Sequence, residues 1–145
     1  MTTPEENAAT ARELVERVLN EGDIPFADKV LSESYVEGSP MPGGTTDKAG
    51  AIAMFTMMRE MTPDMHIDIE DVIASGNKVA MRSTMIGTDT TGMPGMPATG
   101  KPFSMGAMDV FTFDDDGMNT GHYGIYDIVG MMMQLGHMPA PSQGD

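Results

Sequence analysis

The spacing of hydrophobic residues changes once along this chain, near residue 65. Before that point apolar residues recur every three or four positions, which predicts helices over 4–22, 25–31 and 47–61. After it they alternate with polar residues, which predicts strands that begin at residue 66 and continue over 78–87, 101–113 and 118–126. A last helical pattern covers 128–135. This order indicates an α+β fold, in which helices cover one face of a curved antiparallel sheet.

The length of the chain sets the number of domains. Its 145 residues suffice for one domain with a sizeable core and leave no room for a second. We expect the folded domain to span 1–136. The Pro-rich segment 137–145 that follows the last helix is expected to be a flexible tail.

Charge and composition exclude several classes of function. Asp and Glu outnumber Lys and Arg by 22 to 8, a net charge of −14, so we expect no nucleic-acid or membrane partner. There is no Cys, and the three His residues lack ligand spacing, which argues against a metal site. No Gly-rich phosphate loop follows a strand, so we expect no cofactor. The absence of a signal-peptide pattern and of a long apolar run predicts a cytoplasmic protein.

Methionine is the most unusual component of the sequence. There are 18 methionines, many at positions where a core would normally use Leu, Phe or Trp. Because methionine is unbranched and polarizable, it fills irregular space and lines adaptable apolar sites. The content indicates either an ordinary or engineered core with unusual residue usage, or a plastic ligand pocket.

Asp109 is a charged residue on an otherwise apolar face of a predicted strand. The residues that share its parity are Phe103, Met105, Ala107, Phe111 and Phe113. A buried carboxylate needs a partner, and Arg82 on the neighbouring strand is the candidate. The two residues are interpreted as a structural ion pair or, alternatively, as a catalytic dyad. His66 lies on the polar face of its strand and is expected to be solvated.

Several short segments, taken in their order along the chain, are similar to one family. They are MPATGK (96–101), the acidic turn that ends in Gly117, HYGIYD (122–127) and QLG (134–136). In the N-terminal half, Gly22 with Asp23 and Pro63 with Asp64 agree as well. Over nearly its whole length the chain resembles the SnoaL-like polyketide cyclase and ester cyclase family of the NTF2-like superfamily.

The resemblance implies a cone-shaped barrel around one deep cavity, often in homodimers, that takes an apolar, polyketide-like small molecule. It also implies ring closure by intramolecular aldol condensation without metal or cofactor, with an Asp near the C-terminus as acid/base. By its position in the closing run this residue is Asp127, and His122 matches a His common in the family. Taken by itself, Asp127 immediately precedes the last helix and could instead be its N-cap.

Alternation along the last strand assigns side chains to faces. Tyr123 shares the parity of Asp127, so it is expected to face the cavity and to hydrogen-bond a substrate oxygen, as is Tyr126. His122 has the opposite parity and would face the helices or solvent unless a bulge re-aims it. Phe55 and Met105 are expected to contact the substrate, as are Asp109 and Arg82.

Four positions depart from the family pattern at the expected pocket or its rim. They are Gly38, Asp89, Tyr123 and Gly124, and they indicate that an ancestral reaction has been changed, reduced or lost. The leading hypothesis is a cofactor-independent, cyclase-like enzyme that uses Asp127 as acid/base. The alternatives are a non-catalytic small-molecule binding protein, an engineered scaffold, and an epoxide hydrolase-like or isomerase activity.

Overall fold

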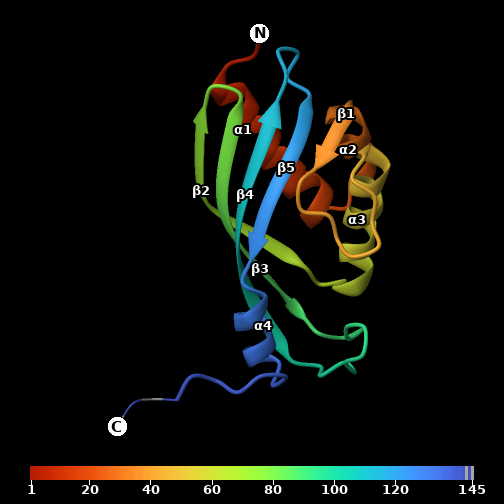
Figure 1. Cartoon of the computed structure of the whole chain (residues 1–145), viewed down its shortest axis with the longest axis vertical. Helices are drawn as coiled ribbons and strands as arrows, with labels where there is room; N and C mark the ends of the chain where they lie inside the picture. Colours follow the sequence, from red (N-terminus) through yellow and green to blue (C-terminus); the bar gives the residue numbers. More distant parts are fainter. Residues whose placement is uncertain (143, 145) are drawn as a thin grey trace.

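A computed structural model describes residues 1–142 and 144 (Figure 1). The helices are α1 (Pro4–Glu13), η1 (Leu14–Asn20), α2 (Ile24–Val30), α3 (Lys48–Met61) and α4 (Ile128–Gln134). The strands are β1 (Leu31–Glu37), β2 (His66–Ser75), β3 (Lys78–Thr88), β4 (Pro102–Phe113) and β5 (Asn119–Tyr126). The α+β class is therefore confirmed. Of the tail predicted over 137–145, residues 143 and 145 lie outside the described residues.

Side-chain caps explain where the helices begin. Thr3 and Glu6 form a reciprocal capping box at the start of α1, and Asp47 accepts a hydrogen bond from the backbone N–H of Gly50 at the start of α3. The helix predicted over 4–22 is α-helical only to Glu13 and then continues as a π-helix, η1, to Asn20. None of the helices in the described part of the chain is long and apolar enough to cross a membrane.

The sheet has five strands in the order β1-β5-β4-β3-β2. The four predicted strands are antiparallel neighbours in chain order. The fifth strand, β1, was not predicted. It lies at the sheet edge and pairs with β5 in parallel, with Leu31 opposite Asn119 and Glu37 opposite His122. The sheet is therefore mixed, and β1 brings a stretch of chain between α2 and α3 beside the last strand.

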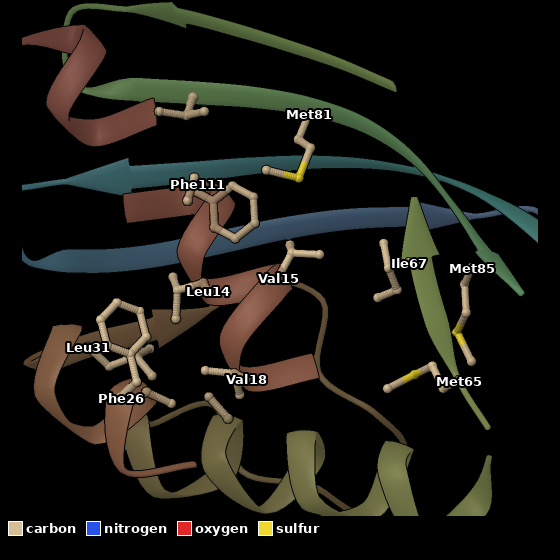
Figure 2. Close-up of a cluster of buried hydrophobic side chains, with 14 of the residues drawn as sticks. Leu14, Val15, Val18, Phe26, Leu31, Met65, Ile67, Met81, Met85 and Phe111 are labelled. Carbon is tan, nitrogen blue, oxygen red and sulfur yellow. The ribbon is translucent and has the colours of Figure 1, made fainter. Parts of the chain in front are cut away.

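The hydrophobic core lies between the first helices and the inner face of the sheet (Figure 2). Leu14, Val15 and Val18 of η1 are buried together with Met81 of β3 and Phe111 of β4. In Figure 1 the helices α1 to α3 lie on one side of the sheet, while α4 follows β5 at the end of the molecule that carries the C-terminus. The core is therefore enclosed between one layer of helices and one face of the sheet.

Candidate active site

A cavity of about 70 Å³ lies inside this core, between η1, α3 and the inner face of the sheet. Most of its wall is apolar, and Phe55, Met58, Met85 and Met105 contribute to it. The polar part of the wall comes from β1, β3, β4 and β5, and consists of Tyr35, Glu37, Ser83, Asp109, Asn119, His122 and Tyr126. Of the residues expected to contact a substrate, Phe55, Met105, Asp109 and Tyr126 lie together in this wall.

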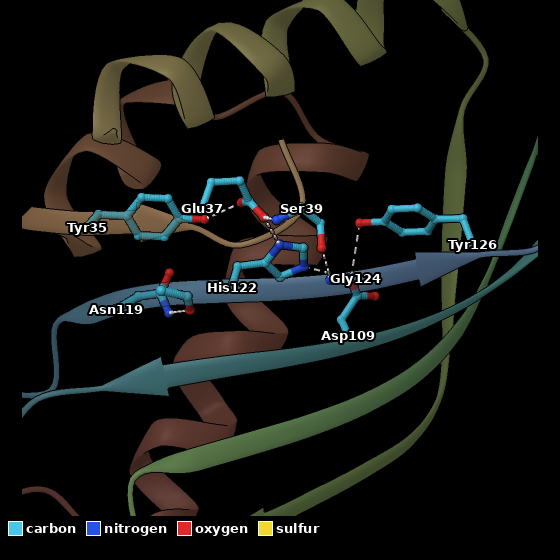
Figure 3. Close-up of polar contacts among 9 residues, drawn as sticks. Tyr35, Glu37, Ser39, Asp109, Asn119, His122, Gly124 and Tyr126 are labelled. Atoms are coloured by element: carbon cyan, nitrogen blue, oxygen red, sulfur yellow. Dashed lines mark hydrogen bonds and ion pairs between the residues drawn. The ribbon is translucent and has the colours of Figure 1, made fainter. Parts of the chain in front are cut away.

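His122 is held between two carboxylates at the centre of this polar group (Figure 3). Its Nδ1 lies 2.8 Å from Oε1 of Glu37, and its Nε2 lies 2.7 Å from Oδ1 of Asp109. The three side chains are buried, with 10% of His122, 2% of Glu37 and 12% of Asp109 exposed. Because each ring nitrogen faces a carboxylate oxygen, the geometry favours the doubly protonated imidazolium.

Glu37 is fixed by further hydrogen bonds on the side away from Asp109. The hydroxyl of Tyr35 donates to its Oε2 at 2.6 Å, and the backbone N–H of Ser39 donates to its Oε1 at 3.0 Å. The backbone N–H of Gly124 donates in turn to the Ser39 hydroxyl. A buried carboxylate with this many donors keeps one position and one charge state.

The pKa shifts in the array follow from burial and charge. Burial alone would lower the pKa of His122, but hydrogen bonds to Asp109 and Glu37 and the charges of both carboxylates raise it to about 9. Burial would raise the pKa of Glu37. The hydrogen bond and charge of His122, together with hydrogen bonds from Tyr35 and Ser39, nevertheless hold this pKa below its ordinary value. At neutral pH Glu37 is therefore ionised and His122 carries a proton on each ring nitrogen.

Tyr126 is the second side chain, after His122, that hydrogen-bonds to Asp109. Its hydroxyl donates to Oδ1 of Asp109 at 3.3 Å. Burial, followed by the negative charge of Asp109, raises the pKa of Tyr126, so the phenol remains a proton donor throughout the physiological range. Both donors to Asp109 use Oδ1, and Oδ2 has no hydrogen-bond partner among the described residues. One oxygen of Asp109 is thus free for a ligand.

Asp127 has the geometry of a helix cap. It is exposed at the start of α4, where its carboxylate accepts a hydrogen bond from the backbone N–H of Gly130 at 2.9 Å. It lies outside the wall of the cavity. The structure thus shows the capping arrangement that the position immediately before a helix allows.

The two faces of β5 are the reverse of those expected. His122 and Tyr126 point into the cavity, whereas Tyr123 is 63% exposed on the outer face, where its ring covers Gly38. The expected cavity contact of Tyr123 is therefore wrong. The error came from taking Asp127, which already belongs to the turn into α4, as the reference for the face of the strand.

The expected pairing of Arg82 with Asp109 is also wrong. Arg82 lies on the outer face of the sheet, where its guanidinium binds Glu70 at 2.6 Å and Asp71 at 2.7 Å. In the sheet register Arg82 stands opposite Met108, so its side chain and that of Asp109 point to opposite faces. The partner of Asp109 is His122.

His66 is exposed, as its place on a polar strand face predicted. It pairs with Asp68.

Two residues of the site, Glu37 and Tyr35, were missed by the sequence reasoning. Both lie on β1, the strand that was not predicted, and both are almost fully buried. Tyr35 and Glu37 alternate with the exposed Ser34 and Val36, but Glu33, which has the same parity, is exposed, so the pattern is too short to predict a strand from the sequence. Asp89, a position that departs from the family pattern, is buried and organises its loop by accepting hydrogen bonds from Gly92 and Thr99.

A curved sheet that wraps a small apolar cavity with helices on one side defines the class of NTF2-like proteins. Within that class the chain belongs to the SnoaL-like polyketide cyclase family, whose sequence model matches residues 9–135. No significant match to the chain is found among curated proteins.

Solved structures from three bacteria share the fold over nearly their whole length. TsrD from Streptomyces laurentii is 25% identical, with a TM-score of 0.83, over 95% of this chain and 100% of TsrD. IdmH from Streptomyces antibioticus, a candidate polyketide cyclase, is 28% identical, with a TM-score of 0.79, over 90% of this chain and 98% of IdmH. A candidate polyketide cyclase from Acidithiobacillus ferrooxidans is 28% identical, with a TM-score of 0.79, over 94% and 99% of the two chains.

Proposed function

We propose that the protein is a cofactor-independent, cyclase-like enzyme that performs acid/base chemistry on a carbonyl-bearing, polyketide-like or other apolar small molecule. The observation that carries the proposal is the free oxygen of Asp109 inside an apolar cavity, with His122 and Glu37 behind it. Membership of the SnoaL-like family and the likeness to candidate cyclases support the same reaction class.

Asp109 acts as the base in the first step. Its Oδ2 takes a proton from the carbon next to a substrate carbonyl, and the electron pair of the broken C–H bond forms an enolate. The enolate carbon attacks a second carbonyl of the same molecule, which forms the new C–C bond and leaves an alkoxide. The proton on Asp109 then passes to the alkoxide, so the enzyme ends in its starting state.

His122 positions Asp109 during these steps, and Tyr126 stabilises the negative charge that forms on the substrate. The imidazolium of His122 stays next to Oδ1, where it fixes the orientation of Oδ2. The hydroxyl of Tyr126 is close enough to Asp109 to turn its hydrogen bond from Oδ1 to the enolate oxygen. Donors that are already in position lower the barrier because they need no reorganisation during the reaction.

Asp127 has a weaker claim to the acid/base role. Its carboxylate is engaged by the backbone of α4 and lies outside the cavity wall. We therefore assign the role to Asp109. The epoxide-opening alternative depended on Asp109 together with Arg82, and these residues lie on opposite faces of the sheet.

A homodimer is part of the proposal, since the outer sheet face presents an apolar surface. Ile125 is 73% exposed, and its cross-strand neighbour Met108 is exposed too. The next pair along the same two strands, Tyr123 and Val110, extends this surface. Contiguous exposed apolar side chains of this kind favour association with a second protein surface.

Exchange of α-protons tests the first step without knowledge of the natural substrate. The neutral ketone 2-tetralone is incubated with the protein in D₂O, and loss of its α-proton signals is followed by NMR. We expect catalysed exchange that falls by about 100-fold or more in Asp109→Asn and is unchanged in Asp127→Asn. Equal exchange by wild type and Asp109→Asn would show that Asp109 is not the base.

A further inference from the structure

A second, outer chamber of about 200 Å³ adjoins the inner cavity. Methionines make up nine of its lining residues, half of the 18 in the sequence. Four of them come from α3, and the others come one each from β3, β4, α4 and the two loops 38–47 and 89–101. The methionine content of the sequence is thus gathered in the wall of one chamber.

The spacing of the α3 methionines explains how the chain builds this wall. Met54, Met57, Met58 and Met61 follow at intervals of three, one and three residues, which places them on one face of the helix. That face looks into the chamber. A run with this helical period therefore provides a continuous thioether surface.

The outer chamber and the inner cavity share part of their walls. Met54, Met58, Met85 and Met105 line both, as does Tyr126, whose hydroxyl reaches Asp109. Of these, Met54 also lines a third hollow between α3 and the loop 38–47. A ligand that lies in the outer chamber can therefore extend one end past flexible side chains to the acid/base array.

The charge of the outer chamber restricts its occupant. Among the described residues, its wall contains no Lys, Arg or His side chain, and its one carboxylate is that of Asp89. Asp89 is held ionised because hydrogen bonds from Thr99 and Gly92 lower its pKa. An anionic group in this chamber would be desolvated without a counter-charge, inside a chain of net charge −14.

We propose that the outer chamber binds the apolar body of the substrate, that this body carries no anionic group, and that the methionine wall accepts bodies of different shapes. The reacting end, which rests on the proposed function, occupies the inner cavity. Methionine has three rotatable side-chain bonds and a polarizable sulfur, so such a wall can repack around different ligands. The substrate is therefore a small molecule whose body is uncharged where it lies in the chamber.

Two fluorescent probes with the same ring system test the charge rule. N-phenyl-1-naphthylamine is neutral, and 1-anilinonaphthalene-8-sulfonate is its sulfonated form. We expect the neutral probe to bind the protein at least about tenfold more tightly. Equal affinity, or tighter binding of the sulfonate, would overturn the exclusion of anionic bodies.

Polar substitutions locate the binding site. Met57→Gln combined with Met61→Gln keeps side-chain length and helix propensity but puts amides in the chamber wall. We expect it to weaken binding of the neutral probe by about tenfold. Met108→Gln, on the outer sheet face, is the matched control and should leave the affinity unchanged. Loss of binding in the control alone would place the probe on the outer sheet face and contradict the proposal.

Leucine substitutions test the tolerance of shape. In Met57→Leu combined with Met61→Leu the wall stays apolar but becomes branched and stiffer. The naphthylamine probe is a compact ligand and 1-decanol is an extended one, and displacement of the probe by 1-decanol gives the affinity of both. We expect the ratio of these two affinities to differ by about threefold or more between the leucine variant and the wild type. An unchanged ratio would contradict an adaptive role for the methionines.

Asp109→Asn separates this inference from the proposed reaction. We expect this variant to lose α-proton exchange and yet to bind the neutral probe as the wild type does. Probe binding that is sensitive to the chamber substitutions supports the chamber whatever the exchange result. Exchange that depends on Asp109 supports the reaction whatever the probes show.

Discussion

Glu37 and His122 occupy paired positions on two neighbouring parallel strands, β1 and β5, and their side chains meet at 2.8 Å. They are 85 residues apart in the sequence. The strand pairing therefore places a buried negative charge behind the imidazole, and the other ring nitrogen reaches Asp109. The charge state of the whole site depends on this pair.

Replacing Glu37 by Gln should lower the pKa of His122 from about 9 toward its ordinary value of 6.5, because one of its two carboxylate partners is lost. Titration of the imidazole signals by NMR measures this shift. Glu33→Gln, which neutralises an exposed carboxylate, is the control and should leave the titration unchanged. A His122 pKa that stays near 9 in Glu37→Gln would show that Glu37 does not keep His122 protonated.

Stability should depend on pH through the same pair. His122 has a raised pKa in the folded state, so its contribution is complete below pH 6.5 and is lost as pH rises toward 9. Glu37 has a lowered pKa, so its contribution is present above 4.5 and is lost as pH falls below that value. We expect urea unfolding to show a loss of about 2–3 kcal/mol between pH 6.5 and 9. His122→Asn should remove most of this loss, and a slope that persists in the variant would assign it to other groups.

Substitution by Asn should have different effects at Asp109 and at Asp127. Asp109→Asn should abolish catalysed exchange, while Asp127→Asn should keep both activity and stability, since Asn caps a helix about as well as Asp. Asp127→Ala should cost about 1 kcal/mol in thermal or urea unfolding without a change in exchange. A loss of exchange in Asp127→Asn, with stability preserved, would return the acid/base role to Asp127.

Removing the hydroxyl of Tyr126 should slow the reaction and leave the fold intact. Tyr126→Phe takes away a donor next to Asp109 but keeps the ring that lines both cavities. We expect α-proton exchange to fall by about 10- to 100-fold with little change in binding of the neutral probe. A matched fall in probe binding would mean that the ring position, and not the hydroxyl, had changed.

A charge on the outer sheet face should disrupt self-association. Ile125→Asp places a carboxylate at the most exposed apolar position of β5. We expect sedimentation analysis to show a dimer for the wild type and a monomer for the variant. Lys78→Gln, at the start of β3 and away from this surface, is the control. A wild-type monomer at micromolar concentration would contradict the proposed dimer.

Much of the site could have been anticipated from local patterns, and some of it was. The parity of Asp109 with five apolar residues predicted a buried carboxylate, and the structure buries it in the cavity wall. The partner of Asp109 was assigned wrongly, because knowing that two strands are neighbours does not tell which of their side chains lie on the same face of the sheet. The register places Arg82 opposite Met108 and leaves Asp109 to His122.

The sequence by itself determined the helices, the four antiparallel strands and the α+β class, since periodicity and caps act within a few residues. Only the tertiary structure decided that residues 31–37 form a strand, because its hydrogen-bond partners lie on β5, far along the chain. The same long-range pairing brings Glu37 to His122 and turns His122, not Tyr123, toward the interior. The charge of the site is thus a property of strand register, which no local pattern encodes.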